Sequence, residues 1–475
     1  MATNPLTRTI IIAHEFNQGR TCRILFPRDN ALATDLYELT MAAAYFENRE
    51  SGKATFELFV RNLPKNRSYL VAAGLEQVVE YLRSLRFEKA HVDFLRKHAS
   101  FKDIGDGFFR YLSQFRFTGD AWALPEGTVF FANEPVLRVT APIIEAQIIE
   151  TYLLTTINFE TLIATKASRV VQSARGRDVI EFGARRAHGP EAGLLAARSS
   201  YIGGCVGTSN VLAGYAFGIP TYGTLAHSFV MNYETEEEAF NKFCKTFPSN
   251  PALLLDTYDT IRAVRKAIPL KPSLVRLDSG DRYDLSVKVR RILDDAGLKE
   301  TKIFVSGDLN EFIIDDLTSR GAPIDAFGVG TELVTSRDEP ALQGIYKIVE
   351  TRRNGELSFR VKTSEGKRTL PGAKQVYRKY SSDGEITEDV LALAREDRIP
   401  VGEPLLVEVF RGGKLVYSLP PLTEIRERAM KNVSRLPAAF RDLNNSQPSP
   451  VVLSKRLQQL SESLWKEPER PRGDA

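Results

Sequence analysis

Cysteine and long hydrophobic runs are both scarce in this sequence. Only three of its 475 residues are cysteines, Cys22, Cys205 and Cys244. Their odd number, wide spacing and lack of a CxxC pair argue against a disulfide framework or a zinc site. No segment approaches the roughly 18 apolar residues that a membrane-spanning helix needs, and the apolar TIII at 9–12 is too short for a signal-peptide core. We therefore expect reduced thiols, a cytoplasmic protein and no membrane partner.

A strong excess of either charge is missing too. The 64 lysines and arginines nearly balance the 60 aspartates and glutamates, which leaves a net charge of +4. No basic run is interleaved with aromatic residues, so we expect no nucleic-acid partner. With 43% hydrophobic and 26% charged residues, the chain has the composition of an ordinary globular protein. Its length predicts two or three compact units.

Common nucleotide-binding motifs are also absent. The sequence contains no GxxxxGK[ST] loop and no GxGxxG after a predicted strand. LDDAG at 293–297 is weakly similar to the acidic diphosphate-binding loop of classical phosphoribosyltransferases, but its Asp294 and Asp295 end a predicted helix, whereas that loop follows a strand. We therefore interpret these two aspartates as a solvated helix face. The sequence has no internal repeat and no low-complexity tract.

The first part of the chain predicts helices mixed with short strands. Residues 1–30 lack periodicity and are interpreted as an arm. After the arm, capping residues, alternation and proline stops delimit the elements. They are a helix from Thr34 through TDLYELTMAAAYFENRE, a strand at 53–64, a helix at 69–85, and several short strands at 117–142.

After Ala141 the pattern of predicted elements changes. A long helix is expected at 143–174, and alternating strands and helices follow it. The expected strands are DVIEFG, IPTYGT, SLVRLDSGD, TKIFVSGD and IDAFGVG, and the expected helices lie in GTSNVLAGYAFG, at 284–296, and in NEFIIDDLTSRG. Gly297 is placed to end the second of these helices. Alternation of this length predicts a parallel sheet with right-handed crossovers.

From about 345 the alternation stops and antiparallel hairpins are expected. Asn354-Gly355, Asp383-Gly384 and Gly412-Gly413 stand between strand-like runs, as hairpin turns do. LSKRLQQLSESLWKE at 453–467 has the pattern of an amphipathic final helix, and EPERPRGDA is interpreted as a disordered tail.

The ends of the predicted parallel strands run into small or charged residues. The loops are EFGARR, YGTLAHS, RLDSGD, VSGDLN and FGVGTEL. In a parallel barrel such loops gather at the carboxyl end, where active sites are built. Glycines admit phosphate oxygens to backbone N–H groups and arginines offer paired donors. The residues suited to phosphate are Arg185, Arg186, Arg276, Gly307, Gly328 and Gly330.

Each of these residues also has a simpler interpretation. The glycines are turn formers and the arginines surface charges in that case. Asp278 and Asp308 fit ribose hydroxyls or a metal-bound diphosphate, or else two helix caps. His227, one of only five histidines, stands in a strand-to-helix turn, where it is either a catalytic group or a hydrogen-bonded turn residue.

Seven stretches between about 34 and 350 resemble one known family and occur in that family's order. They are TDLYELTMAAAYF, FELFVRNLPKNRSYLVAAGLEQVVEYL, EFGARRAHGPEAGL, GTSNVLAGYAFGIPTYGTLAHSFV, VRLDSGD, VSGDLNE and FGVGTELVTS. The chain resembles nicotinate phosphoribosyltransferase, a type II phosphoribosyltransferase of pyridine-nucleotide salvage. The first thirty and last hundred residues carry little of this resemblance.

The resemblance implies an α/β fold, an irregular TIM-like α/β barrel with an additional α+β domain built from N- and C-terminal segments. The expected division is an arm at 1–30, a discontinuous α+β domain at 31–142 and 346–440, a barrel at 143–345, and a C-terminal helix and tail at 441–475.

The resemblance also implies a reaction and its partners. Nicotinate and phosphoribosyl diphosphate give nicotinate mononucleotide and diphosphate, coupled to ATP hydrolysis with Mg²⁺, in a ligase-type enzyme. The protein is expected to be a homodimer whose active site the neighbouring subunit completes. His227, in GTLAHS, corresponds to the histidine that ATP phosphorylates. A neutral imidazole nitrogen can attack a γ-phosphoryl group.

The resemblance assigns roles to further residues. Phe182 and, from the partner chain, Tyr37 are expected to stack on the pyridine ring, while Arg276 and Asp278 lie between base, ribose and diphosphate. The residues expected to bind the phosphoribosyl group are Arg185, Gly307, Asp308, Gly328, Gly330 and Thr331. Arg49 joins His227 in the expected ATP and diphosphate site. Arg186 is still interpreted either as a phosphate-binding residue or as a surface charge. His188 is expected to have no role in the reaction.

Four other functions compete with this interpretation. Nicotinamide phosphoribosyltransferase carries an aspartate where this chain has Ser209, and a serine hydroxyl can donate to the carboxylate of nicotinate. Quinolinate phosphoribosyltransferase is related in fold, but it is shorter and lacks the phosphorylated histidine. A non-catalytic nucleotide sensor should have lost His227, Arg185, Arg276 or Asp278, yet all four are present. A barrel phosphosugar isomerase would need no ATP.

Overall fold

The computed structural model describes residues 30–249, 251–396 and 400–466. Within them the chain forms two compact units, described separately below: the α/β unit, residues 163–340, and the α+β unit, residues 30–162 and 341–466. The division falls inside one long helix, at Leu162, whereas the sequence suggested a change near Pro142. The predicted N-terminal arm, Cys22 and the predicted tail lie outside the described residues.

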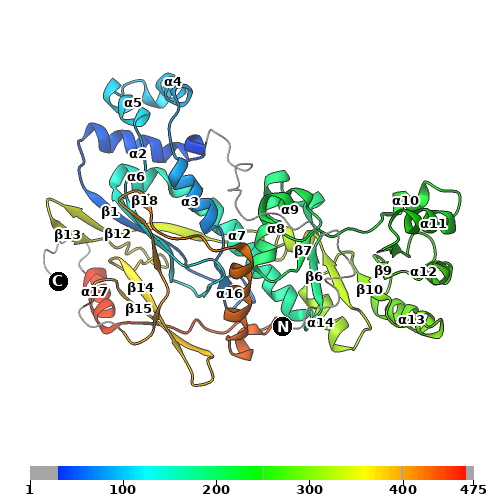
Figure 1. The fold of residues 1–475 in the computed structure, drawn as a ribbon. Coiled ribbons are helices and arrows are strands. Elements are labelled where there is room, and N and C mark those ends of the chain that lie inside the picture. The colour runs from blue at the N-terminus through cyan, green and yellow to red at the C-terminus, as the bar shows by residue number, and fades with distance from the viewer. Residues whose placement is uncertain (1–29, 250, 397–399, 467–475) are drawn as a thin grey trace. The chain divides into compact units, whose positions relative to one another are not determined.

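The α+β unit is built on sheets that are antiparallel except at one strand pair, β15–β19 (Figure 1). Its largest sheet has the order β13 (Glu356–Phe359), β12 (Gly344–Arg353), β1 (Lys53–Val60), β5 (Pro135–Pro142), β3 (Asp120–Ala123), β17 (Val407–Arg411) and β18 (Lys414–Leu415). A second sheet has the order β16 (Glu403–Pro404), β14 (Lys374–Tyr380), β15 (Ile386–Leu393) and β19 (Val451–Leu453), and β2 (Leu70–Val71) pairs with β4 (Val129–Phe130). The three hairpins predicted from glycine turns are confirmed as β12–β13, β14–β15 and β17–β18.

Some helices of the α+β unit contact these sheets, and α5 (Asp106–Ser113) packs with α2 (Leu36–Glu47) and α4 (Lys89–Lys97) instead. The other helices are α3 (Leu75–Ser84), α6 (Ile143–Ile148), α16 (Leu422–Ser434) and α17 (Lys455–Lys466), and α7 (Glu150–Ser173) begins in this unit. The helix predicted at 143–174 is therefore two helices, separated at Ile149. The helix predicted at 69–85 is wrong at its start, because Leu70 and Val71 pair with β4 and Gly74, at φ 98°, precedes the first turn of α3.

The α/β unit contains a six-stranded, wholly parallel sheet. Its strand order is β7 (Gly207–Thr208), β6 (Asp178–Glu181), β11 (Ala326–Val329), β10 (Lys302–Val305), β9 (Leu274–Leu277) and β8 (Ala252–Leu254). Each strand lies beside its successor in the chain except at one place, and the last strand pairs with the first. That order belongs to an incomplete barrel that is open between β7 and β8. The predicted α/β fold, a TIM-like barrel with an additional α+β domain, is thus confirmed.

The opening of the barrel lies where the strand IPTYGT was predicted. This prediction is wrong, because the segment forms only a single bridge, between Thr208 and Thr221. Pro220 has no N–H to donate, although its carbonyl accepts the N–H of Thr208 at 3.0 Å, and the N–H of Tyr222 donates to Thr208 at 2.9 Å. The segment therefore crosses the edge of the sheet as a loop.

Helices of the α/β unit connect successive strands. They are the rest of α7, then α8 (Pro190–Ile202), α9 (Val211–Phe217), α10 (His227–Met231), α11 (Glu236–Thr246), α12 (Thr260–Ala267), α13 (Arg282–Asp295), α14 (Glu311–Ser319) and α15 (Thr331–Val334). The helix predicted at 284–296 is confirmed as α13, whose Val289 and Leu293 are buried against strands of the sheet and whose end is followed by Gly297 at φ 76°.

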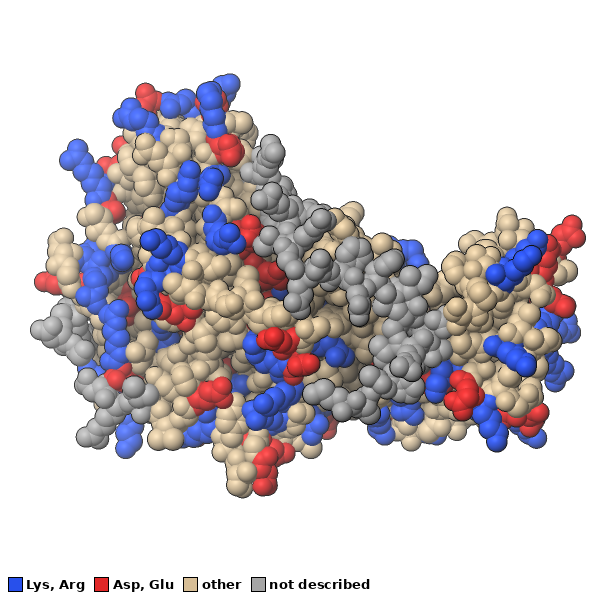
Figure 2. All heavy atoms as spheres, viewed as in Figure 1, with Lys and Arg blue, Asp and Glu red and all other residues tan. Residues whose placement is uncertain are grey.

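The surface carries both charges side by side. On the face seen in Figure 2, lysine and arginine side chains lie among aspartate and glutamate side chains. Ion pairs also form within single helices, such as Lys89–Asp93 in α4 and Lys288–Asp284 in α13, each at 2.6 Å. Among the described residues, no helix combines the length and hydrophobicity needed to cross a membrane. Cys205 and Cys244 are free thiols.

Candidate active site

The carboxyl ends of the parallel strands display most of the predicted site residues. Because the strands are parallel, their carboxyl ends meet at one edge of the sheet. Phe182 follows β6, Ser209 follows β7, Arg276 and Asp278 lie at the end of β9, Gly307 and Asp308 follow β10, Gly328 lies in β11, and Gly330 and Thr331 follow it. His227 is the first residue of α10. The structure thus brings these residues to the same edge of the α/β unit.

Arg276 and Asp278 form the centre of this edge through a dense polar network. Arg276 Nη2 lies 2.6 Å from Asp278 Oδ1, and its Nε donates to Ser306 Oγ at 2.8 Å. Ser306 in turn donates to the same carboxylate oxygen at 2.5 Å. Arg276 Nη1 donates to Thr224 Oγ1 at 3.0 Å. A guanidinium held by three partners from three segments has a fixed orientation.

This network sets the charge state of Asp278. Burial alone raises the pKa of the carboxyl, but the hydrogen bond from Ser306, the charge and hydrogen bond of Arg276, and the charge of His227 together bring the pKa below its ordinary value. Asp278 is therefore ionised at neutral pH. Because its folded-state pKa is depressed, the carboxylate stabilises the fold above its ordinary pKa, and this contribution is lost as the pH falls through the lowered pKa.

His227 stands beside this carboxylate with an accessible ring. Its Nε2 lies 3.9 Å from Asp278 Oδ2, and its Nδ1 lies 3.2 Å from Thr257 Oγ1, at the carboxyl end of β8. The side chain is 42% exposed. One ring nitrogen thus contacts a hydroxyl while the other faces an anion, an arrangement that orients the imidazole for nucleophilic or acid–base chemistry.

An aromatic wall lies next to Arg276. The ring centroids of Phe182 and Phe304 are 5.5 Å apart, and the guanidinium carbon of Arg276 lies 5.8 Å from the Phe182 centroid. Gly328 passes under both rings, because a Cβ there would come within 2.7 Å of Phe304 and 2.9 Å of Phe182. Phe182 is half-buried, so part of its side chain remains available for stacking with a planar ligand.

The loop after β10 requires glycine at 307. Gly307 has φ 85°, and a Cβ at this position would lie 1.9 Å from the backbone oxygen of Asp278. Asp308 follows at φ 47°, also in the left-handed region. Two successive residues of this conformation turn the backbone sharply at the carboxyl edge. Arg282 donates to the carbonyls of Ser306 and Gly307 and so holds the turn.

We expect Gly307→Ala to disrupt this edge. The left-handed backbone and the clash with Asp278 together should lower the free energy of unfolding by about 2–5 kcal/mol. The matched control is Gly321→Ala, since Gly321 has φ 72° but open space around its Cβ, and it should cost about 1–2 kcal/mol. Urea denaturation of both variants measures the difference. Equal losses would show that the contact with Asp278 is unimportant.

The remaining predicted residues have different environments. Arg185 and Arg186 lie in the short 3₁₀ helix η3 (Ala184–Arg186) after β6, and both are exposed, as is His188. Ser209 is half-buried, and its N–H donates to the carbonyl of Glu181 at 2.9 Å.

Tyr37 and Arg49 belong to the α+β unit, so the contacts above do not include them. Tyr37 lies in the first turn of α2 and is 47% exposed. Burial of its hydroxyl and the negative charge of Glu150, to which it is hydrogen-bonded, raise its pKa above the ordinary value. Arg49 lines a groove of about 550 Å³ with neighbours from α2, α5 and α6.

Several polar residues at the edge had not been singled out from the sequence. Ser306 and Thr224 complete the Arg276 network, Thr257 contacts His227, and Asp256 accepts a hydrogen bond from Ser279 at 2.5 Å. The apolar run LLL stands directly before Asp256-Thr257. An apolar run followed by polar residues also marks the other strand ends, so this pattern could have identified the pair.

Carboxylates suited to a divalent cation are few at this edge. Among the described residues, no group of three or more His, Cys, Asp or Glu side chains could hold a metal ion by itself. Asp256 Oδ1 is nevertheless buried and accepts no hydrogen bond from the described part of the chain. Mg²⁺ usually keeps several waters and binds one or two carboxylates together with substrate phosphates. Asp256 and Asp278 therefore fit a magnesium ion that arrives with a diphosphate.

Family models match three successive parts of the chain. The model for the nicotinate phosphoribosyltransferase N-terminal domain matches residues 32–158, and the model for its C-terminal domain matches residues 401–461. Between them, the model for the quinolinate phosphoribosyl transferase C-terminal domain matches residues 163–339, which is nearly the whole α/β unit.

Solved structures share this architecture. The crystal structure of human nicotinic acid phosphoribosyltransferase is 31% identical, with a TM-score of 0.80, and the match covers 91% of this chain and 99% of that one. The nicotinate-nucleotide pyrophosphorylase from Pyrococcus furiosus is 26% identical, with a TM-score of 0.69 and coverage of 87% and 98%. The fold is therefore that of a pyridine-nucleotide phosphoribosyltransferase.

Curated relatives narrow this class further. Nicotinate phosphoribosyltransferase pncB2 of Mycobacterium tuberculosis is 47% identical over 437 residues, which cover 90% of this chain and 92% of the relative. The nicotinate phosphoribosyltransferase of Bacillus subtilis is 38% identical, with coverage of 90% and 93%. The chain belongs to the nicotinate phosphoribosyltransferase family.

Proposed function

We propose that this protein forms nicotinate mononucleotide and diphosphate from nicotinate and phosphoribosyl diphosphate in NAD biosynthesis, and that ATP hydrolysis drives the reaction through a phosphohistidine at His227. The observation that carries this proposal is the position of His227 beside the Asp278–Arg276–Ser306 network at the carboxyl edge. The family's glycine-rich loops after β10 and β11 stand at the same edge.

The phosphohistidine step needs a neutral imidazole nitrogen. That nitrogen attacks the γ-phosphorus of ATP, the bond to the β,γ-bridging oxygen breaks, and ADP leaves. Asp278 and Thr257 flank the two ring nitrogens and would keep the ring oriented during attack. Mg²⁺ would neutralise phosphate charge, and Asp256 and Asp278 would hold it. Arg49 is proposed to contact the nucleotide or diphosphate.

In the transfer step, the edge would hold phosphoribosyl diphosphate against the base. Backbone N–H groups of the two glycine-bearing loops and the Arg185 guanidinium fit the 5′-phosphate, with Asp308 and Thr331 at the ribose and its phosphate. The ribose C1–oxygen bond to diphosphate breaks as the pyridine nitrogen bonds to C1. Asp278 lies at the carboxyl end of β9, and its pKa is lowered, so that it is ionised at neutral pH. Its negative charge is suited to stabilise the positive charge that develops on the ribose.

Nicotinate rather than nicotinamide is the proposed base. Phe182 offers a ring face beside the Arg276 guanidinium, which matches a flat anion. Ser209 begins the loop after β7 and can donate a hydrogen bond to the carboxylate. Nicotinamide is the alternative base, and the residue at 209 is the feature that distinguishes the two.

A homodimer with shared active sites is part of the proposal. Helix α9, which follows Ser209, exposes Val211 at 77%, Tyr215 at 54% and Leu212 at 41%. Such an apolar helix face beside a site is suited to a subunit contact. Tyr37, exposed on α2, is proposed to reach the partner's pyridine site.

The shared site predicts complementation between two inactive variants. Tyr37→Ala and His227→Ala should each be nearly inactive as homodimers, whereas a mixture that forms heterodimers should regain part of the activity, because one of the two sites is then intact. Nicotinate mononucleotide formation by purified, doubly tagged heterodimers measures the gain. Heterodimers as inactive as the parents would place Tyr37 outside the partner's site.

One assay separates this function from its rivals. ADP release and substrate turnover are measured with ATP alone, with each substrate added singly, with nicotinate or nicotinamide together with phosphoribosyl diphosphate, and with a phosphosugar in the absence of ATP. We expect ADP release to accelerate in step with nicotinate mononucleotide formation. Preference for nicotinamide would indicate the related amide-specific enzyme, binding without turnover would indicate a nucleotide sensor, and turnover of a phosphosugar without ATP would indicate an isomerase.

A further inference from the structure

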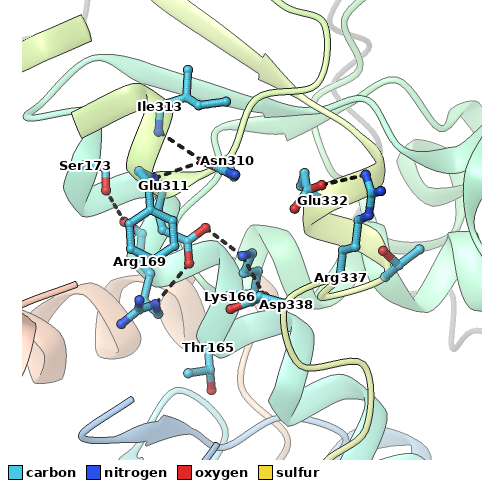
Figure 3. Close-up of polar contacts among 12 residues, drawn as sticks. Thr165, Lys166, Arg169, Ser173, Asn310, Glu311, Ile313, Glu332, Arg337 and Asp338 are labelled. Atoms are coloured by element: carbon cyan, nitrogen blue, oxygen red, sulfur yellow. Dashed lines mark hydrogen bonds and ion pairs between the residues drawn. The ribbon is translucent and has the colours of Figure 1, made fainter. Parts of the chain in front are cut away.

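A buried cluster of four charges lies in the α/β unit and is made of residues other than those of the Arg276–Asp278 network (Figure 3). Lys166 Nζ lies 2.6 Å from Glu311 Oε2 and 2.8 Å from Asp338 Oδ1. Arg169 Nε lies 3.2 Å from the other oxygen of Glu311. Lys166, Arg169 and Glu311 are almost completely buried, and Asp338 is 32% exposed. Two cations thus balance two anions.

The cluster joins three segments that are far apart in the sequence. Lys166 and Arg169 lie one turn apart on α7 and point to the same carboxylate (Figure 3). Glu311 is the first residue of α14, so it ends the loop that carries Gly307 and Asp308. Gly330 directly precedes α15, and Asp338 lies four residues after the end of that helix. A single ammonium group therefore links the residue that follows the Gly307–Asp308 loop to a residue four positions beyond α15, the helix that Gly330 precedes.

Both loops need support from outside. Each contains a non-glycine residue in the left-handed region, Asp308 at φ 47° and Ser336 at φ 41°. Such residues persist only where the surrounding structure holds them. Asn310 supports the first loop locally, because its side chain caps α14 by accepting the N–H groups of Phe312 and Ile313. The pairing of β10 with β11 sets where the two loops begin, and Lys166 joins the segments in which they continue.

Stability alone is a weak explanation for a cluster of this kind. The desolvation of buried ions offsets much of their attraction, so apolar residues of equal volume often serve the fold as well. In some proteins buried polar or ionic groups instead specify one geometry among several. Here the imposed geometry is the relative placement of two loops.

We propose that Lys166 is a positioning residue that fixes the loops bearing Gly307–Asp308 and Gly330–Thr331 relative to one another, so that both contact one phosphoribosyl group. This inference rests on the proposed function, because it assigns the two loops to that substrate. Lys166 itself contacts no reacting atom. Its effect passes through Glu311 to one loop and through Asp338 to the other.

Asp338→Asn tests the proposal with little risk to the fold, because Asp338 is partly exposed and the amide keeps its size. We expect the KM for phosphoribosyl diphosphate to rise about tenfold, since small displacements of positioning groups are costly. The KM for nicotinate and the melting temperature should change little. Asp338→Glu, which retains the charge, should recover part of the loss.

The matched control is Asp315→Asn. Asp315 on α14 pairs with Arg175, just beyond the end of α7, at 2.9 Å, and both side chains are about half exposed. This pair joins the same two helices without touching either loop. We expect wild-type kinetics from this variant. A KM for phosphoribosyl diphosphate that is unchanged in Asp338→Asn, or that changes equally in Asp315→Asn, would overturn the proposal.

Calorimetric binding of ribose 5-phosphate separates this inference from the proposed reaction. It needs no turnover, and Asp338→Asn should bind about tenfold more weakly than wild type and Asp315→Asn. If wild type binds with this pattern but forms no nicotinate mononucleotide, the proposed function fails and the positioning role stands. If wild type forms the product and all three proteins bind ribose 5-phosphate equally, the positioning role fails alone. If the wild-type protein does not bind ribose 5-phosphate, the positioning role of Lys166 fails as well.

Discussion

Replacing His227 by alanine is expected to abolish ATP coupling and leave the fold intact. In the proposed mechanism the imidazole accepts the phosphoryl group, and because the side chain is 42% exposed it contributes little to the core. Loss of a phosphorylated nucleophile should reduce coupled turnover by at least about a thousandfold. Slow synthesis of nicotinate mononucleotide without ATP should survive. Parallel measurement of ADP and nicotinate mononucleotide tests this expectation.

His188→Ala provides the control for this experiment. His188 is exposed in the loop after η3 and is given no role in the reaction. Its variant should couple ATP hydrolysis to product formation as wild type does, with an unchanged melting temperature. A His227→Ala enzyme that still hydrolysed ATP in step with product would contradict the phosphohistidine assignment.

Replacing Ser209 by aspartate should reverse the base preference. The substitution removes a hydrogen-bond donor and places a negative charge near the carboxylate of nicotinate at a half-buried position. Together these effects should cost about 2–4 kcal/mol, or roughly thirty- to a thousandfold in kcat/KM for nicotinate. Nicotinamide, which is neutral and can donate from its amide, should lose far less or gain.

Ser209→Ala separates the two effects, because it removes the donor without adding charge. Its loss for nicotinate should be about tenfold, in keeping with one hydrogen bond to a charged group. Both bases are compared at saturating phosphoribosyl diphosphate. An unchanged ratio of kcat/KM values in Ser209→Asp would show that residue 209 does not contact the substituent, and Arg276 would then be the next residue to test.

Local patterns in the sequence were sufficient to predict the edge that carries the site. Each strand–loop boundary is encoded by an apolar run followed by small or charged residues, so Asp278, Gly307 and Gly330 could be placed at strand ends without knowing which strands are neighbours. The resemblance then supplied roles, such as phosphoryl transfer to His227. Those roles stay predictions, as do the reach of Tyr37 and the use of Mg²⁺.

Contacts between distant segments could not be predicted in this way. Ser306 and Thr224 meet Arg276 across separations of 30 and 52 residues, and only the strand order brings them together. Lys166 has the local sequence of an ordinary helical lysine, and its burial depends on α14 and on the segment after α15. The strand predicted at IPTYGT failed for a similar reason, since its composition favours a strand but Pro220 prevents regular pairing.

Transient labelling of the enzyme by γ-³²P-labelled ATP tests the central claim most directly. In a single turnover without nicotinate and phosphoribosyl diphosphate, the account predicts acid-labile, base-stable label on the peptide that contains His227. Addition of both substrates should discharge the label as nicotinate mononucleotide forms. Label on another residue, or label that survives product formation, would contradict the account.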